Sequence, residues 1–366
     1  MLFPCFRIFQ YRNILELVLT PITMFEFPKI LILNHFPKGY ALARYTDNLH
    51  HVVRGNAEVI NIKFNPSYHD FPKGLLYDGT RSASFNVTAR RIVYIKMINH
   101  LKESIRDGSI IHYTEQSMPY FSKGSDNEIV TFHDLFAFDE NNSFRGVLYK
   151  KFTREFLKFT NAIAVSNTTK AKVEEKNFGG QIETIYHGVP EIFHPRLNKK
   201  HLREKYKLPF DKKLIVSVSS DSPRKNLKLL TEISQKISGE FEIIRVGPSA
   251  GFNLNFKNIS DNALSEIYSA SDAFILTSTF EGFNFPVTEA MASGLPVIVS
   301  DIEIMNEITG SAGILCNNDD AESFVEGINE ASNQQEKYTS LSLKRAKHFN
   351  MHKFSSEMTA YYKRFL

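Results

Sequence analysis

Two glutamates in one short string could bind a ligand that carries both hydroxyl groups and negative charge. The string is Glu281-Gly-Phe-Asn-Phe-Pro-Val-Thr-Glu289. The backbone amides from Gly282 to Phe285 and the start of the following helix form a natural anion site, and carboxylates accept hydrogen bonds from hydroxyls. A nucleotide sugar has hydroxyls on both sides of a phosphate and fits this chemistry. Either glutamate alone is typical of a structural carboxylate at a helix start, but the aromatic loop between them has no evident role in a core.

Two adjacent cations, Arg224 and Lys225, lie in a second loop, Ser220-Asp-Ser-Pro-Arg-Lys-Asn226. Positive charge at a helix start opposes the helix dipole, so these side chains need a compensating anion. A diphosphate would supply it, with Arg224 as a forked donor and Lys225 as a point charge. The alternative is a pair of solvated side chains.

The first half of the chain places a polar pair, His133 and Asp134, directly after the apolar run that ends in Val130-Thr-Phe. We expect His133 to face the region between the two halves, in a catalytic or sugar-binding role, although a lone histidine is as often structural. His112, His187 and His194 are further candidates; the last two lie in a turn-rich segment that explains them without a ligand.

These loops follow short apolar strands that alternate with helical patterns, which is typical of a parallel sheet covered on both faces. Ligands of such sheets bind beyond the carboxyl ends of the strands. In the first half we predict strands at 30–33, 57–62, 110–113, 128–132 and 162–165, and helices at 41–53, 86–105 and 144–159. In the second half we predict strands at 213–219, 241–246, 273–277 and 296–300, helices at 226–237, 262–269 and 287–293, and a last helix at 340–366.

The length of 366 residues favours two domains. The turn-rich segment at 186–197 predicts the linker between them. We therefore expect an N-terminal extension at 1–23, a first domain at 24–190, a second domain at 191–340, and a C-terminal helix at 341–366 that packs back on the first domain. Residues 1–23 are either outside the core fold or the product of an upstream start codon.

Composition narrows the class of protein. Hydrophobic residues at 42% and charged residues at 23% exclude a disordered or collagenous chain. The two cysteines, Cys5 and Cys316, cannot form a disulfide framework, which favours a reducing, cytoplasmic compartment. No apolar run has the roughly 18 residues of a membrane span. Walker A, Gly-x-Gly-x-x-Gly and Asp-x-Asp strings are absent, which disfavours kinases, classical dehydrogenases and a dedicated catalytic metal.

The net charge of +4 is concentrated in the first half. Residues 1–190 hold 23 Lys and Arg against 18 Asp and Glu. This excess is too small for a nucleic-acid-binding arm, but it suits peripheral contact with the anionic inner face of a membrane, or an anionic acceptor.

Together these segments resemble the retaining nucleotide-sugar glycosyltransferases of family four (glycosyl transferases group 1). Their α/β fold, GT-B, consists of two Rossmann-like doubly wound domains facing a cleft. The resemblance covers roughly residues 28 to 330 and is strongest between 212 and 315. It is carried by Thr131-Phe-His-Asp-Leu135, Ala164-Val-Ser166, Tyr186-His-Gly-Val-Pro190, Pro223-Arg-Lys-Asn-Leu227, the string from Glu281 to Ala290, and Ser311-Ala-Gly-Ile-Leu315.

The resemblance implies a role for each second-domain residue of the site. Glu289 would bind the ribose hydroxyls, and Glu281 would face the C3 and C4 hydroxyls of the transferred sugar. Lys225, with Arg224, would neutralise the diphosphate and assist its departure. The backbone amides offered to the sugar and diphosphate would be those of Phe283, Asn284 and Phe285.

In the first domain, the resemblance implies that His133 contacts the C6 side of the sugar near the reacting centre, and that Gly39 lets the backbone approach the donor or acceptor closely. Three departures from the family pattern matter. Ser219-Ser220 stands where Gly-Arg is common, so Arg224 would replace that arginine. Asn284 stands where glycine is frequent and would narrow the sugar pocket. The paired glycines of the first loop are reduced to Gly39.

The function implied is retaining transfer of a hexose from a nucleoside-diphosphate sugar to an acceptor hydroxyl on a glycan or glycolipid. Neither a cofactor nor a dedicated metal is expected, and nucleic acid is not an expected partner. The Pro223-Arg-Lys-Asn226 loop resembles that of mannosyltransferase members of the family, which implies GDP-mannose as the donor, with UDP-glucose as the other choice. Two alternatives stay open: a nucleotide-sugar epimerase of the same fold, which would need no acceptor, and a non-catalytic nucleotide-sugar binding protein, which would bind donor without turnover.

Overall fold

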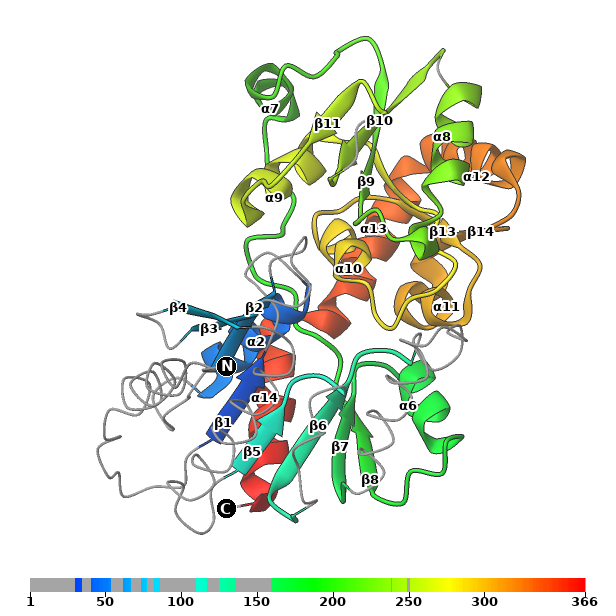
Figure 1. Cartoon of the computed structure of the whole chain (residues 1–366). Coiled ribbons are helices and arrows are strands. Elements are labelled where there is room, and N and C mark those ends of the chain that lie inside the picture. The colour runs from blue at the N-terminus through cyan, green and yellow to red at the C-terminus, as the bar shows by residue number, and fades with distance from the viewer. Residues whose placement is uncertain are drawn as a thin grey trace, which may run out of the picture.

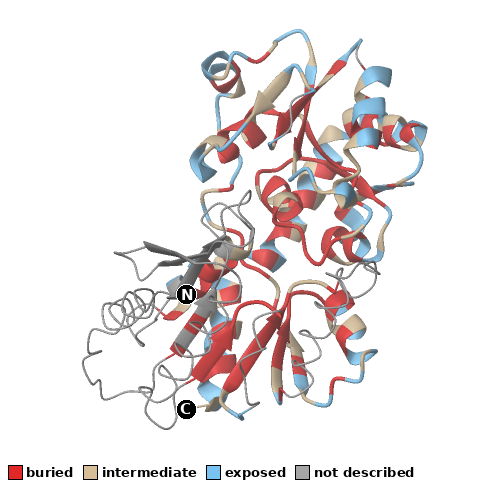
Figure 2. Cartoon of the chain, in the orientation of Figure 1, coloured by how far each residue is buried: buried red, intermediate tan, exposed pale blue. Residues whose placement is uncertain are grey.

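The computed structural model describes residues 30–34, 41–53, 62–66, 74–77, 82–85, 110–116, 125–135, 159–237, 239–248 and 251–365. These residues form two α/β domains, each built on its own sheet (Figure 1). Buried residues follow both sheets, whereas exposed residues lie on the outer faces of the surrounding helices (Figure 2). The fold class predicted from the alternating strands and helices is confirmed.

The first sheet has the strand order β4-β3-β2-β1-β5-β6-β7-β8 among the described residues. From β1 the chain moves outward through β2 and β3 to β4, and it then returns to β5 on the other side of β1. Strand β3 pairs antiparallel with β2 and with β4, and the other pairs of strands are parallel. The elements are β1 (Ile30–Asn34), α2 (Ala41–Val53), β2 (Ile62–Pro66), β3 (Gly74–Tyr77), β4 (Ser82–Phe85), β5 (Ile110–Tyr113), β6 (Glu128–Phe132), β7 (Asn161–Ala164), α6 (Asn167–Glu174) and β8 (Gln181–Thr184).

Of the strand predicted at 57–62, only Ile62 lies within the described residues, where it begins β2. This strand pairs with β1 on one side and with β3 on the other. Strands β3 and β4 were not predicted. The predicted helix at 86–105, the predicted helix at 144–159 except for its last residue, the extension at 1–23 and Gly39 lie outside the described residues.

The second sheet is parallel, with the order β11-β10-β9-β12-β13-β14 among the described residues. The chain moves outward from β9 to β11 and then returns to β12 on the other side of β9, so the strand order reverses between β9 and β12. Loops after these two strands therefore flank the topological switch point, where open α/β sheets bind ligands. The strands are β9 (Lys213–Val218), β10 (Phe241–Val246), β11 (Leu254–Phe256), β12 (Ala273–Leu276), β13 (Val297–Ser300) and β14 (Gly313–Cys316).

Helices cover both faces of the second sheet (Figure 1). Strand β12 is buried along its whole length, as expected of a central parallel strand. Helix α8 turns Leu229, Leu230 and Ile233 into the core, Leu227 packs partly buried against it, and the other positions are polar. The helices are α7 (Lys199–Lys205), α8 (Leu227–Lys236), α9 (Asp261–Ala270), α10 (Phe285–Ala292), α11 (Glu303–Thr309), α12 (Ala321–Asn333) and α13 (Gln335–Ala346).

The helix predicted at 340–366 is two helices, α13 and α14 (Met351–Tyr362). The break lies at Asn350, whose side-chain oxygen accepts a hydrogen bond from the Lys353 amide at 2.8 Å and so begins a new helix. Helix α14 packs against α2 and buries Phe354 and Met358 in the core of the first domain. The end of the chain thus crosses from the second domain back to the first (Figure 1). None of the helices described is long and apolar enough to span a bilayer.

Candidate functional site

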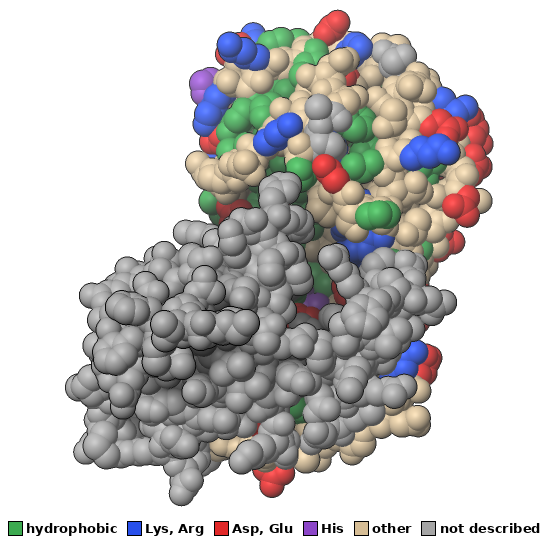
Figure 3. Space-filling view, in the orientation of Figure 1, with side chains coloured by type: hydrophobic (Ala, Val, Ile, Leu, Met, Phe, Trp, Pro, Cys, Tyr) green, Lys and Arg blue, Asp and Glu red, His purple; other side chains and the backbone are tan. Residues whose placement is uncertain are grey.

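Loops from the two domains meet where the sequence predicts a site. Gly282, in the loop after β12, lies directly against the loop after β6: a Cβ atom on Gly282 would be 1.6 Å from the His133 carbonyl oxygen. From α6, the Thr169 hydroxyl donates to the Gly282 carbonyl oxygen at 3.4 Å. Figure 3 shows a hollow between the domains, with histidine and acidic side chains visible inside it. The polar pair after β6 and the glutamate string after β12 are therefore neighbours across the domain interface.

Arg224, Lys225 and Glu281 form one buried cluster. Arg224 Nη1 lies 3.1 Å from Glu281 Oε2, and Lys225 Nζ donates to Glu281 Oε1. Only 11% of the Lys225 side chain and 5% of the Glu281 side chain are exposed, so this pair is largely shielded from water. The loops are joined by their backbones as well, since the Thr279 amide donates to the Arg224 carbonyl oxygen at 2.8 Å. Glu281 thus supplies the compensating anion for the two cations in this structure.

Burial and opposite charge act against each other in this cluster. Burial alone would raise the pKa of Glu281, but Lys225 and Arg224 outweigh it and hold that pKa below its usual value. Burial lowers the pKa of Lys225, and the negative charges of Glu281 and of Asp134 in the first domain act in the opposite direction. The cations stand in a 3-10 turn, Pro223–Lys225, and Asn226 with φ 49° separates them from α8. They lie just before the helix and not in its first turn.

The loop between the two glutamates offers its backbone and buries its rings. The Phe283 ring packs edge-on against His187 with a centroid distance of 4.8 Å, and the Phe285 ring stacks on His187 at 4.4 Å. Both phenylalanines are almost fully buried. The expectation that these aromatic residues have no role in a core is therefore wrong, because they form the packing between the domains.

Asn284 adopts the left-handed conformation, with φ 79°. Asparagine tolerates this region better than most residues other than glycine, so it can stand where the family has glycine. Its side-chain oxygen accepts a hydrogen bond from the Val287 amide at 3.1 Å and caps α10. The extra side chain is thus used at the helix end.

Glu289 is completely buried in α10 and has partners at both oxygens. The Tyr268 hydroxyl donates to Oε2 at 3.2 Å, and Arg44 Nη1 donates to Oε1. Arg44 comes from the first domain, near the start of α2, and its Nη2 also contacts Asp261. Sequence reasoning missed Arg44. Its position in the sequence could have indicated it, because Arg44 lies near the start of the helix that follows the first strand. In parallel sheets, ligands bind at this end of the strands.

His133 is held as a neutral ring. Its Nε2 lies 2.7 Å from the Thr114 carbonyl oxygen, which can only accept, so Nε2 carries the proton and Nδ1 is left as an acceptor. Burial lowers the pKa of His133 to about 4, although the hydrogen bond to Thr114 acts against this shift. The ring also packs against Tyr45 and stacks on His187 at 5.3 Å. A neutral acceptor at this position suits a sugar hydroxyl.

The other candidate histidines have structural surroundings. His112 is fully buried, with Tyr362 Oη 2.6 Å from Nδ1 and Thr131 Oγ1 2.7 Å from Nε2. His187 is buried between His133 and Phe285, and its Nδ1 has no hydrogen-bond partner among the described residues. His194 is exposed and closes a turn, with Nδ1 3.0 Å from the Glu191 carbonyl oxygen.

Stability should fall below neutral pH because three buried histidines resist protonation. Burial lowers the pKa of His112 to about 3 and of His133 to about 4, and that of His187 well below the ordinary 6.5. Between pH 6.5 and pH 4 the unfolded chain therefore binds more protons than the folded chain, and each pKa unit corresponds to about 1.4 kcal/mol. We expect the free energy of unfolding, measured in urea at several pH values, to fall steadily from pH 6.5 to 4.5.

His187→Gln should flatten this decline, whereas the exposed His352 provides a control, His352→Gln, that should leave it unchanged. A free energy of unfolding that stays constant between pH 7.5 and pH 5 would contradict the argument, since carboxylates titrate only below that range.

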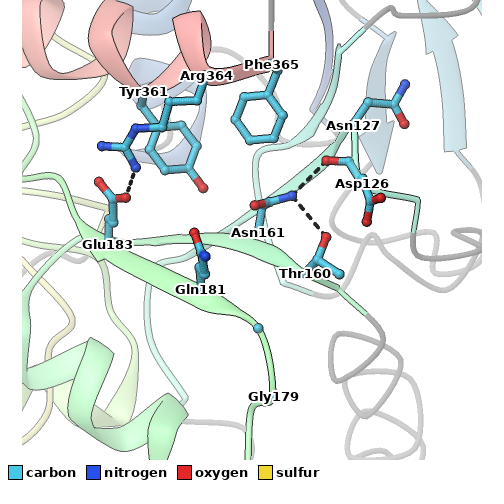
Figure 4. Close-up of a pocket in the computed structure, with 11 residues that line it drawn as sticks. Asp126, Asn127, Thr160, Asn161, Gly179, Gln181, Glu183, Tyr361, Arg364 and Phe365 are labelled. Atoms are coloured by element: carbon cyan, nitrogen blue, oxygen red, sulfur yellow. Dashed lines mark hydrogen bonds and ion pairs between the residues drawn. The ribbon is translucent and has the colours of Figure 1, made fainter.

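A cavity of about 590 Å³ lies at the opposite edge of the first sheet. It is formed at the amino ends of β6, β7 and β8, under the end of α14 (Figure 4). Asn161 donates across it to the Asp126 carbonyl oxygen at 2.8 Å, and Arg364 pairs with Glu183. The described residues that line this cavity include none of the predicted site residues.

Comparison with known proteins finds a family whose model matches part of the second domain. Residues 253–348 match the family described as Glycosyl transferases group 1. A curated relative, the O-antigen chain mannosyltransferase RfbU of Salmonella typhimurium, is 25% identical over 220 residues, which is 55% of this chain and 60% of that protein. The match thus spans less than two thirds of the length of that relative.

Solved structures share the whole two-domain fold. Sucrose-phosphate synthase from Thermosynechococcus elongatus superposes with a TM-score of 0.75 and 16% identity, over 92% of this chain and 99% of that one. Anabaena HepE, solved in complex with UDP and glucose, superposes with a TM-score of 0.72 and 14% identity, over 92% of this chain and 100% of that one. At these identities the likeness shows a common fold.

Proposed function

We propose that this chain transfers a hexose from a nucleoside-diphosphate sugar to an acceptor hydroxyl with retention of configuration. Its GT-B fold and the match of residues 253–348 to glycosyl transferases group 1 support this proposal. One observation carries this proposal. Arg224, Lys225 and Glu281 come together at the switch point between β9 and β12, opposite His133 of the other domain. The two cations suit an anionic group and the carboxylate suits hydroxyl groups, so the arrangement suits a ligand that carries both.

The proposed chemistry is electrostatic. As the bond between sugar and diphosphate breaks, negative charge grows on the departing diphosphate and positive charge on the sugar. Lys225 has three N–H donors and can keep its bond to Glu281 while it contacts a phosphate oxygen. Arg224 adds a forked donor, and the amides at 283–285 add fixed dipoles. Donors that are already oriented stabilise such charge without reorganising, so no dedicated metal is part of the proposal.

The donor and the acceptor are proposed from independent clues. The Pro223-Arg-Lys-Asn226 loop and the mannosyltransferase named among the relatives support GDP-mannose, and the complex of HepE with UDP and glucose keeps UDP-glucose as the second choice. The relative is named for an O-antigen chain, which supports a glycan or lipid-linked glycan as acceptor. Peripheral contact of the basic first half with a membrane stays a prediction.

A panel of nucleotide sugars tests the proposal. A donor at about a hundred times its dissociation constant stabilises the folded chain by about 2.7 kcal/mol, which raises Tm by roughly 3 to 4 °C for a chain of this length. We expect this shift with GDP-mannose or UDP-glucose but with neither free sugar, and we expect transfer to a glycan acceptor with retained configuration by NMR.

Each alternative has its own outcome in the same panel. Conversion of the donor sugar without an acceptor would identify an epimerase, and a Tm shift without turnover on any acceptor would identify a binding protein. If no nucleotide sugar shifted Tm, the assignment of the site itself would be wrong.

A further inference from the structure

Arg44 links the two domains at the site. It lies near the start of α2, the helix that follows β1, and its guanidinium reaches into the second domain. Nη1 contacts Glu289 of α10 and Nη2 contacts Asp261 of α9. Its side chain is 23% exposed, whereas Glu289 is fully buried. One cation of the first domain therefore covers the carboxylate that the ribose would need.

The surroundings of Arg44 connect it to the proposed diphosphate site. Its Cζ lies 5.9 Å from the centre of the Phe285 ring and 5.7 Å from that of Phe193. Phe285 is the first residue of α10 and one of the residues whose amides would bind the diphosphate. The guanidinium thus pairs with the proposed ribose carboxylate and lies close to the ring of the residue that begins α10.

Donor binding at this point requires an exchange of partners. Both oxygens of Glu289 are occupied in the structure, by Arg44 and by Tyr268. A ribose hydroxyl that donates to Oε1 displaces Arg44 at least in part. A guanidinium that leaves Glu289 keeps Asp261 as a partner at Nη2, but its Nη1 side loses an ionic contact in a largely buried place, and a second anion there would compensate for that loss. The donor brings that anion with it, as a diphosphate joined to the ribose.

We propose that Arg44 is a donor-binding residue contributed by the first domain: it pairs with Glu289 when the site is empty and with the diphosphate when the ribose takes Glu289. This inference rests on the proposed function. It makes donor binding a contact between domains, because the phosphate held at α10 is then also held by α2. The forked guanidinium suits two phosphate oxygens, which a lysine ammonium cannot contact in the same way.

Calorimetric titration with UDP, GDP, uridine and guanosine tests this role. Arg44→Gln keeps a polar but shorter side chain and removes the charge, and we expect it to weaken binding of the preferred nucleoside diphosphate by about 10- to 100-fold. The matching nucleoside, which has no phosphate, should change by less than about threefold. Arg44→Lys should recover part of the loss. A control is Arg196→Ala, whose guanidinium contacts Asn262 and Glu266 on the same helix as Asp261; it should bind like the wild type.

Other outcomes would overturn the inference. Equal losses for nucleoside and diphosphate would mean that Arg44 acts only by holding Glu289. Tighter binding by Arg44→Gln would mean that Arg44 only blocks the site, and unchanged binding would remove it from the site. If the wild-type chain bound neither UDP nor GDP, the proposed function would fail first, and that result is distinct from failure of the Arg44 variants alone.

Discussion

Lys225→Met should lower the rate of sugar transfer by about 10²- to 10³-fold. Methionine keeps an apolar stem of similar length and removes the ammonium, so the change isolates the charge. Removal of one preorganised donor from a site of developing charge has an effect of this size. Glu281 keeps Arg224 as an ionic partner at 3.1 Å, which limits the structural cost. The measurement is the turnover rate at saturating donor, together with the circular dichroism spectrum and Tm.

The matched control for this change is Lys213→Met. Lys213 is in the same domain, at the start of β9, and its ammonium also pairs with a glutamate, Glu240 at 2.6 Å, but on the exposed surface. Surface pairs of this kind contribute little to stability, so turnover and Tm should both stay close to wild type. Turnover of Lys225→Met within threefold of the control would remove Lys225 from the catalytic site.

Local sequence patterns predicted the central strands because burial on both faces leaves a plain signal. The runs at 110–113, 128–132 and 241–246 have the predicted boundaries, and each is buried along nearly its whole length. The break between α13 and α14 was missed, since a single capping residue, Asn350, decides it. The edge strands β3 and β4 depend on cross-strand pairing, which leaves no comparable apolar run.

The site, too, contains residues that a local pattern can predict and contacts that it cannot. Glu281, Arg224 and Lys225 follow two strands that are adjacent in the sheet, so the rule for parallel sheets was enough to bring them together. The pairing of Arg44 with Glu289 joins residues that are 245 positions apart and belong to different domains. No local pattern reports such a contact. The same is true of the packing of Phe283 and Phe285 on His187, which depends on how the domains meet.

Because the loops after β6 and β12 touch at Gly282, Gly282→Ala is the most informative steric change. We expect it to lower the rate of sugar transfer by about 10²-fold. The added Cβ would lie 1.6 Å from the His133 carbonyl oxygen and 3.0 Å from Asp134 Cβ. A backbone carbonyl cannot rotate away as a flexible side chain can, so the two loops must separate by an ångström or more. A displacement of this size at a reacting centre costs about two orders of magnitude in rate.

Gly239→Ala is the control for Gly282→Ala, because Gly239 is in the same domain and has no atom within 4 Å of the added Cβ. We expect this control to keep wild-type turnover. For Gly282→Ala we expect the second domain to stay folded, since the clash lies across the interface and not within its core, and small-angle scattering should show a larger radius of gyration. Near-normal turnover together with an unchanged radius of gyration would mean that the loops after β6 and β12 do not need this close approach. The proposal that His133 and the glutamate string act on one donor would then lose its structural basis.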